Sequence, residues 1–423
     1  TGFTAVSGVG YFVNTTAGII TVTLPASPSA GDVVAVSDYA GTADTNNITI
    51  GRNGSNINGA ASDQLISIEN SAVTLVYVDG TQGWKATDTS SLADIALQPI
   101  YITATGGTIT TVCTDYKVHT FTGPGTFTVS CAGNVAGSNS VDYMVVAGGG
   151  GSGAEDAGGG GAGGFRESSG AVSGCYTASP LGACVSALPV ASTGYPIVIG
   201  GGGAAGTPPT ATPSAFGIAG GISSGLGITS AGGGGGGGGE CNTDNGIRQG
   251  KPGGSGGGGA GVYGPQPQDN PDGPSGGTGN TPSVSPSQGF PGGNGPTLSR
   301  LSNGVAELGG GGGGATQAGQ RTPSPTTDGA GGAGGAGATT SINGSPTAFA
   351  GGGAGGVNTS SGTGSPGAGG VGGGGNGGYP ASKSGTAGTT NTGGGGGGDG
   401  GNGGSPGGAG GSGIVIIRYK FQN

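Results

Sequence analysis

The chain has 423 residues, of which 116 are glycine, while only 31% are hydrophobic, 5% aromatic and 7% charged. This composition excludes an ordinary globular core for most of the chain and, because charge is scarce, is also unlike that of typical disordered proteins. The net charge is −9 and the 11 Lys and Arg residues form no basic cluster, so nucleic-acid binding is not expected, and no apolar stretch approaches the ~20 residues that insertion into a membrane requires.

Residues 1–93 have an ordinary composition and predict an all-β N-terminal domain, either a small sandwich or a barrel. The strand candidates are short, β-branched and separated by turn pairs such as Asn53-Gly54 and Asp79-Gly80. They are residues 11–13, 19–24, 33–37, 48–50, 65–68, 73–78 and 84–86. A connector at 94–99 follows; it overlaps a short apolar stretch from Leu92 to Leu97 that suits one helical turn or a bundled neck.

Residues 100–147 predict a second β-domain. Its strand candidates are residues 101–104, 108–112, 116–121, 125–130 and 141–147. Two later stretches, 195–200 and 414–421, have the same character and adjoin glycine runs, so we expect both to return to the same sheet. The glycine-rich region 148–413 would then be one long insertion, anchored by strands at both ends.

A repeat of three residues dominates region 148–413. Its clearest run is 329–337, where Ala330, Ala333 and Ala336 recur between pairs of glycines. This period fits neither an α-helix nor a β-strand but fits the polyproline II helix, with ~3 residues per turn and ~3.1 Å rise per residue. Glycine on two of three faces lets such helices pack at backbone distance. We therefore predict a polyglycine-II bundle with essentially no α-helix; silk-like or flexible-linker behaviour is the alternative.

Glycine tracts such as 148–164 and 393–413 alternate with longer intervals that we predict to be loops. The longest of these intervals are 165–194, 207–231 and 262–308. Helices that run back and forth would place alternate loops at opposite ends of the bundle. These intervals hold most of the prolines, whose fixed φ stiffens a loop.

The chain has five cysteines, which allow two disulfides. Cys113 and Cys131 flank a predicted hairpin, and Cys175 and Cys184 close a short loop, so each pair is a disulfide candidate. Cys241 is left over, either free or bonded to another molecule. No CxxC spacing indicates zinc, and we expect no metal and no other cofactor.

The patterns that would indicate catalysis are weak. The single histidine, His119, has no marked nucleophile or acid near it, so we interpret it as a residue on the surface of a strand. Matches to G-x-S-x-G and G-x-G-x-x-G are expected by chance in a chain so rich in glycine. Glycoside cleavage would need two nearby carboxylates. The candidates are Glu155, Asp156, Glu240, Asp244, Asp269 and Asp272. We predict that the chain is not an enzyme, with polysaccharide depolymerase as a minor alternative.

Several stretches of this sequence resemble parts of a known protein group. Residues 141–150 (VDYMVVAGGG) and the ending 410–419 (GGSGIVIIRY) resemble the opening and the end of the glycine-rich domain of phage tail and virion proteins. The lead-in 116–129 also fits this domain, and residues 15–60 look like modules of tail fibres from phages of marine bacteria and cyanobacteria. The architecture is similar to the adhesins at the tips of T-even-type long tail fibres, although the cysteine-bearing loops and the N-terminal β-domain depart from that pattern.

The resemblance implies an extracellular virion protein that attaches the particle to its host. By resemblance we expect a homotrimer that joins other virion tail proteins through the N-terminal domain. Its loops would bind a host-surface glycan or outer-membrane protein. Weak receptor-binding candidates are Tyr263, Phe290, Phe349 and Tyr379, although each ring could instead cover glycine helices as a local lid. The alternative function is a structural subunit of an extracellular or cell-surface filament, or a capsid decoration, without a receptor.

Overall fold

The computed structural model describes residues 2–88, 96–172, 176–182, 185–207, 215–239, 245–261, 273–296, 307–322, 329–359, 364–401 and 406–423. The chain divides into two compact units, one of residues 1–100 with 133–137 and one of residues 101–132 with 138–423. Nearly all regular structure in the described residues is β, and the helical segment found among them is the single turn α1 (Asn245–Arg248). The predicted all-β fold with essentially no α-helix is confirmed.

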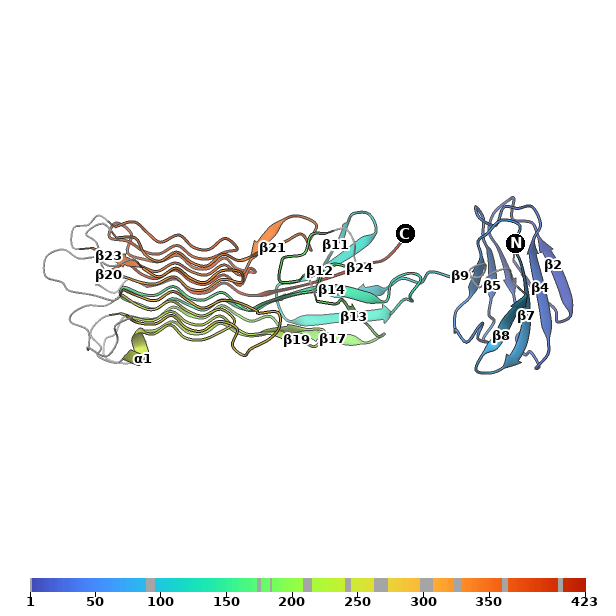
Figure 1. The fold of residues 1–423 in the computed structure, drawn as a ribbon, viewed down its shortest axis with the longest axis horizontal. Coiled ribbons are helices and arrows are strands. Elements are labelled where there is room, and N and C mark those ends of the chain that lie inside the picture. Colours follow the sequence, from blue (N-terminus) through green and yellow to red (C-terminus); the bar gives the residue numbers. More distant parts are fainter. Residues whose placement is uncertain are drawn as a thin grey trace. The chain divides into compact units, whose positions relative to one another are not determined.

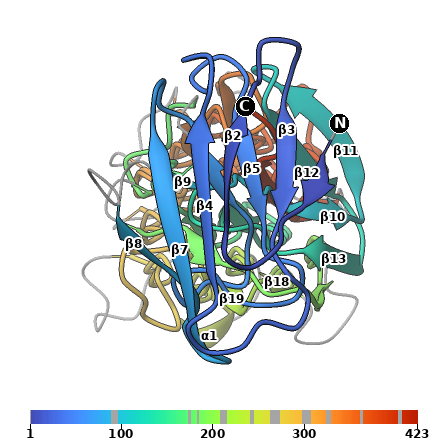
Figure 2. The ribbon, with the colours of Figure 1, turned by 90° about the vertical axis from the view of Figure 1, so that its right-hand side faces the viewer.

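The first unit is a sandwich of two sheets and not a closed barrel. The five-stranded sheet has the order β1 (Phe3–Thr4), β3 (Ile20–Thr23), β5 (Ile48–Gly51), β6 (Gln64–Ile66) and β9 (Ala96–Leu97). The four-stranded sheet has the order β2 (Val9–Val13), β4 (Val33–Asp38), β7 (Ala72–Asp79) and β8 (Gly83–Asp88), with β2, β4 and β7 side by side in Figure 2.

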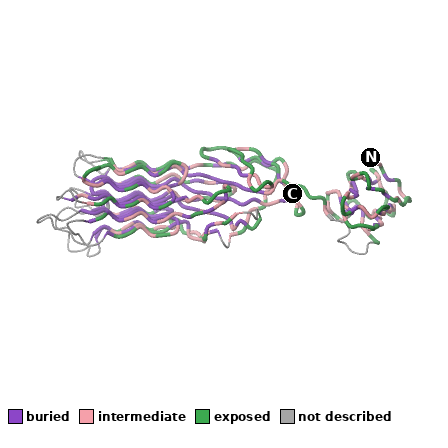
Figure 3. The backbone as a smooth tube through the Cα atoms, turned by 90° about the horizontal axis from the view of Figure 1, so that it is seen from above, coloured by how far each residue is buried: buried purple, intermediate pink, exposed green. Residues whose placement is uncertain are grey.

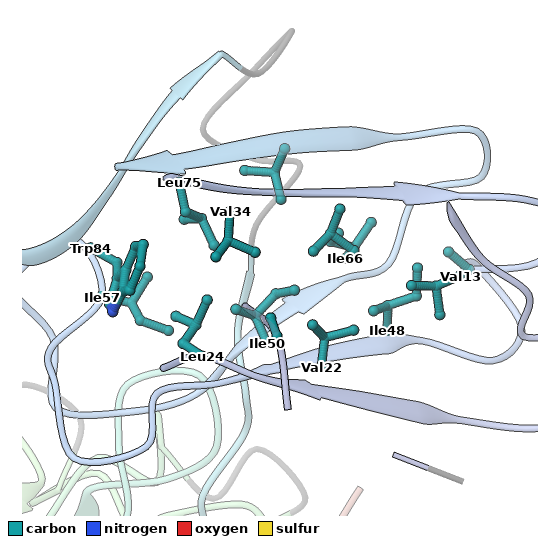
Figure 4. Packing of buried hydrophobic residues seen from close by; sticks show 14 residues of the cluster. Val13, Val22, Leu24, Val34, Ile48, Ile50, Ile57, Ile66, Leu75 and Trp84 are labelled. Carbon is teal, nitrogen blue, oxygen red and sulfur yellow. The ribbon is translucent and has the colours of Figure 1, made fainter. Parts of the chain in front are cut away.

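Every strand predicted in the first unit is confirmed, because alternating β-branched residues fill the space between the two sheets. In β4, Val34 and Val36 are buried while Val33 and Ala35 are not. Figure 4 shows side chains of both sheets packed in one core, with Trp84 and Ile57 at one end of it. The predicted connector is partly wrong, since Ala96–Leu97 pairs with β6 as a strand; residues 89–95 lie outside the described residues.

The second unit begins with two further sheets. One has the order β11 (Thr108–Val112), β12 (Tyr116–Phe121), β24 (Ile414–Lys420), β14 (Ser140–Val146) and β15 (Phe165–Glu167), with β16 (Leu188–Pro189) paired to β14. The other has the order β10 (Thr103–Thr105), β13 (Gly125–Cys131) and β17 (Gly194–Ile197). The two sheets share a core that includes Phe127, Tyr143 and Val415.

The predicted strands of this unit exist, but the expectation that 195–200 and 414–421 return to one sheet is wrong. Strand β24 lies between β12 and β14, whereas β17 pairs with β13 in the other sheet. The chain changes sheets between β12 and β13, because Phe121 and Phe127 both bury their rings between the sheets. The glycine-rich region is thus anchored to both layers.

Glycine tracts run side by side from these sheets as wavy ribbons (Figure 1). Tract 148–154 donates backbone N–H bonds to a different antiparallel tract with each successive residue, and the pattern repeats every third residue. On one face the donors and acceptors are Gly148 with Gly221, Gly151 with Ile218, and Ala154 with Ala215. The next two faces donate to tracts 408–411 and 158–161. This repeat of three is the predicted polyglycine-II geometry.

The carbonyl groups of the same tract accept bonds from three other tracts, 233–239, 203–206 and 393–401. Tract 157–164 likewise donates to tracts 393–399, 231–237 and 310–313 and accepts from tracts 147–153, 255–258 and 353–356. Each of these two tracts therefore has six neighbours, as in hexagonal packing. Both are buried along their whole length, and Figure 3 shows the buried tracts inside the bundle with exposed ones outside.

The close packing requires glycine at most positions where a face meets a neighbouring backbone. A Cβ atom added at Gly158 would lie 2.1 Å from the carbonyl oxygen of Gly258, too close for any real contact. In the outer tract 329–337, Ala330 is exposed and Ala333 half-buried, while Gly332 and Gly335 are buried and donate inward. Side chains of this outer tract are thus placed on its outward face.

The bundle contains more tracts than the sequence predicted. The predicted tracts 148–164 and 393–413 each fold back into two antiparallel tracts, the first through a turn at Glu155 and Asp156. Parts of the predicted loops 207–231 and 262–308 are extended tracts bonded into the bundle, since Gly217 donates to Gly236 and Gly292 to Gly277. An outer tract needs glycine only on its inward face, so its glycines are too sparse to mark it.

Short hairpins and pairs close the bundle at its ends. At the end near β14 and β24, called here the proximal end, they are β18 (Ser223–Gly225) with β19 (Ile228–Ser230) and β21 (Ala338–Thr340) with β22 (Thr347–Phe349). At the opposite or distal end, β20 (Glu307–Leu308) pairs with β23 (Val357–Asn358), near α1.

Two glycine substitutions test whether contact between backbones stabilises the bundle. Gly158→Ala should lower the free energy of unfolding by about 3 kcal/mol, the upper end of overpacking costs, because the new methyl group meets the Gly258 carbonyl. Gly201→Ala is the matched control, since a Cβ there meets nothing within 4 Å; its effect should stay within about 0.5 kcal/mol. Equal midpoints in denaturant for the two variants would contradict the packing described.

Candidate functional site at the distal end

The distal end gathers the ends of tracts that are far apart in sequence. Hydrogen bonds join the turn 154–157 to several of these tract ends: Ala154 to Ala215, Gly239 to Ala154, Gly261 to Asp156 and Gly356 to Ala157. Sequence segments 208–214, 240–244, 262–272 and 360–363 begin or end next to these residues and lie outside the described residues.

Tyr379 is the receptor-binding candidate that the structure places at this end. Its backbone N–H donates to the carbonyl of Ser382 and its carbonyl accepts from the Ser382 N–H, at 2.9 and 2.8 Å, which closes a tight turn. Its half-buried ring packs on a small apolar cluster of Leu308 and Val357. The ring thus covers part of the tract ends and stays partly accessible to solvent.

The other aromatic candidates do not gather with Tyr379. Phe349 is 3% exposed in β22, in the proximal core with Met144 and Ile416, so it is a buried core residue that no receptor can reach in this fold. Phe290 is 36% exposed, but its N–H donates to Gly314 near the proximal end. Tyr263 lies outside the described residues.

Buried carboxyl groups surround the distal turn. Glu155 and Asp156 both have positive φ, 58° and 50°, and both are buried. Asp399 is fully buried in a central tract, its carbonyl accepts the N–H of Ala157, and neither carboxyl oxygen makes a hydrogen bond of normal geometry. Burial, aided by the charge of Glu155, raises the pKa of Asp399 to about 8, although the Glu155 amide acts weakly in the opposite direction.

Two of the acids considered for glycoside cleavage lie in the described part of this end. Glu155 and Asp156 are packed inside the turn, and the four other candidates, Glu240, Asp244, Asp269 and Asp272, lie outside the described residues. Within the described ranges, no group of three or more His, Cys, Asp or Glu residues could hold a metal ion. The depolymerase alternative stays a prediction.

A second buried polar cluster lies at the proximal end around Arg418. The guanidinium group lies 4.9 Å from the ring centroids of both Tyr116 and Tyr176, and its Nη1 donates to the carbonyl of Ile342 at 3.3 Å. Nearby, the Glu167 carboxylate accepts bonds from the Ser179 N–H and the Thr340 hydroxyl, and burial raises the pKa of Glu167. The cluster ties segment 176–182 and the β21–β22 hairpin to the central sheet.

His119 belongs to the core and not to a catalytic site. Its Nδ1 lies 2.7 Å from the carbonyl oxygen of Gly106 and its Nε2 lies 3.1 Å from the hydroxyl of Tyr419, while the ring packs against Phe127. Burial lowers the pKa of His119. The residue lies in a strand as predicted, but on its buried face, so the predicted surface position is wrong.

The predicted Cys113–Cys131 disulfide is not formed, because Cys131 is a free thiol. The prediction assumed a hairpin, but β12 and β13 belong to different sheets and Cys131 pairs with Thr103 instead. Cys113 lies in the β11–β12 turn, where its Sγ is 3.9 Å from Nη2 of Arg418. Cys175, Cys184 and Cys241 lie outside the described residues.

The importance of Asp399 and Arg418 was not predicted from the sequence. Each had a signal, because Asp399 interrupts the run GGGGGGDGG and Arg418 interrupts the apolar strand IVIIRYK. A charge inside a segment that must be buried requires a partner or a raised or lowered pKa. The partner of each residue depends on how segments that are far apart in the sequence are paired.

The fold defines a class of protein: a bundle of polyglycine-II helices built on a pair of β-sheets. The family model for the glycine-rich domain matches residues 120–420, which is well over half of the chain. The chain therefore belongs to the glycine-rich domain family. Among curated proteins, none matches its sequence. No helix in the described ranges is long and apolar enough to cross a membrane.

Replacing the guanidinium group tests the proximal cluster. Arg418→Lys should lower the free energy of unfolding by about 2 kcal/mol, because an ammonium group cannot stack between two rings and still reach the Ile342 carbonyl. Arg321→Lys, on the exposed face of an outer tract, is the control and should change stability by less than about 0.5 kcal/mol. Thermal unfolding measures both; an unaltered midpoint for Arg418→Lys would show that the stacking contributes little.

Proposed function

We propose that the chain is a phage tail-fibre or related virion appendage protein that attaches the particle to its host. The observation that supports this most is the hydrogen-bonded bundle, whose two central tracts each contact six neighbours. Such a rod is stiff, and it carries the ends of many chain segments to one pole. A rigid support reduces the entropy that loops lose when they bind a partner.

The first unit suits a role in assembly with other virion proteins. It exposes large apolar side chains, notably Phe12 at 79%, Ile19 and Tyr39, which are costly to leave in water and are typical of surfaces that contact other subunits. The resemblance to tail fibres favours a homotrimer. In this proposal the first unit joins the virion and the bundle points its distal end toward the host.

The receptor would be a glycan or an outer-membrane protein of the host surface. Tyr379 supports a glycan, because a partly accessible tyrosine ring that packs on a rigid base can contact a sugar ring. The alternative is a filament or capsid-decoration subunit that needs no receptor. The arrangement of copies on the native particle distinguishes the two: threes or sixes at a tail favour the fibre, and continuous stacking favours a filament.

Competition for host attachment tests the proposed function. The purified full chain should reduce adsorption of virions that carry it, and Tyr379→Ala should require about tenfold more protein for the same reduction, the loss expected for about 1.4 kcal/mol of stacking. Phe290→Ala is the control on the proximal part of the bundle and should compete as the wild type does. Undiminished adsorption at saturating wild-type protein would refute host attachment by this chain.

The depolymerase alternative has a separate measurement. Host-surface polysaccharide incubated with the full chain should keep its length distribution by size-exclusion chromatography. Shortened chains that appear with the wild type and persist after Tyr379→Ala would assign a hydrolytic activity and contradict a purely adhesive role.

A further inference from the structure

We propose that the carboxyl group of Asp399 is a pH-operated catch for the distal turn. When this group is uncharged, the turn at Glu155 and Asp156 packs on tract 393–401. When it is ionised, the turn and the tract ends bonded to it loosen. The inference concerns the bundle itself and does not depend on what the protein binds. It begins from the position of one acid in a region that is otherwise almost free of side chains.

The surroundings of Asp399 disfavour the ionised form of its carboxyl group. The residue is fully buried among backbone groups that already bond to one another, and both of its carboxyl oxygens lack a hydrogen bond of normal geometry. A carboxylate without partners in such a place is strongly disfavoured, whereas the neutral acid costs much less. The packed state therefore favours the protonated form.

The titratable groups near Asp399 also disfavour its ionised form. The segments bonded to 393–401 are 148–154, 157–164, 351–357, 375–378, 383–386 and 408–412. With the turns that join them, these tracts bring the titratable residues Glu155, Asp156, Tyr379 and Lys383. Glu155 carries the charge that acts on Asp399, and it has the same sign as an ionised Asp399. Ionisation would place two negative charges in one buried corner.

The distal turn at Glu155 and Asp156 is itself easily opened. Glu155 and Asp156 both adopt left-handed backbone conformations, which cost energy for residues other than glycine. The bond from Ala157 N–H to the Asp399 carbonyl, at 3.3 Å, is long compared with most bonds of the bundle. The turn also accepts the N–H of Gly261 at 2.7 Å, so its opening would release the end of a second tract.

The direction of the pH effect follows from linkage. Unfolding or local opening returns Asp399 to an ordinary pKa of 3.8, whereas the closed pKa is about 8. Between these values the open state releases the proton and the closed state keeps it, so the closed state loses stability as pH rises from about 4 to 8. Below and above this window the contribution of Asp399 is constant.

Hydrogen exchange of individual amides in the full chain tests the catch. After correction for the base catalysis of exchange, the opening constant at the amides of Ala157 and Gly261 should rise by up to about tenfold per pH unit between pH 5 and 8 and then level off. The amide of Gly150, bonded to Gly161 within the bundle, reports the interior and should not show this rise. Asp399→Asn should abolish the rise, and Glu155→Gln should move it to lower pH.

Glu167→Gln is the matched control, since Glu167 is a buried acid with a raised pKa at the proximal end. It should leave the pH dependence at Ala157 unaltered. Wild-type exchange at Ala157 that follows Gly150 at every pH would overturn the proposal, as would a rise that persists in Asp399→Asn. Titration of the Asp399 carboxyl by carbon NMR in the wild type decides even if the variant does not fold: a pKa near 4 refutes the catch.

Discussion

The bundle depends on one constraint: neighbouring backbones must approach closely enough for amide and carbonyl groups to bond directly. In a helix with three residues per turn, successive N–H groups point to three different neighbours, and successive carbonyls to three more. Tract 157–164 uses all six directions. The backbone N–H and C=O groups inside the bundle are hydrogen-bonded to one another. The bundle therefore avoids the cost of unpaired buried amides without a hydrophobic core. A single Cβ in the wrong place removes both the contact and the bond.

The same constraint decides how much of the fold the sequence could predict. Residues 329–337 reveal their geometry because two of three faces are glycine, and the strands of the first unit reveal theirs through alternation. Outer tracts such as 288–296 remain hidden, because glycine is needed only on the face that turns inward, and proline or polar residues fill the others. The turn at Glu155 and Asp156 could not be predicted, since Glu is not a usual choice for positive φ and the turn needs two such residues in succession.

The candidate site was less predictable than the fold, because it depends on register between segments far apart in the chain. Phe349 and Phe290 looked equivalent to Tyr379 in sequence, yet β22 turns the ring of Phe349 into the proximal core. The Cys113–Cys131 pairing failed for a related reason: residues that are close in sequence were separated when β12 and β13 joined different sheets. Strand β24, which carries Arg418 and Tyr419, pairs with β12 and β14, two strands that lie far earlier in the sequence.

A bundle whose interior is mostly backbone restricts where side chains can be placed. The central tracts 148–154 and 157–164 carry only small side chains, such as the buried Ser152 and Ala162, because each face meets a neighbouring backbone. Outer tracts accept larger residues on their outward faces, as at the exposed Ile218. In the function proposed above, recognition would therefore be carried by residues outside the central tracts, which can change without disturbing the bundle. Asp399 is a buried acid at the distal end, so the stability of that end can differ from that of the rest of the bundle.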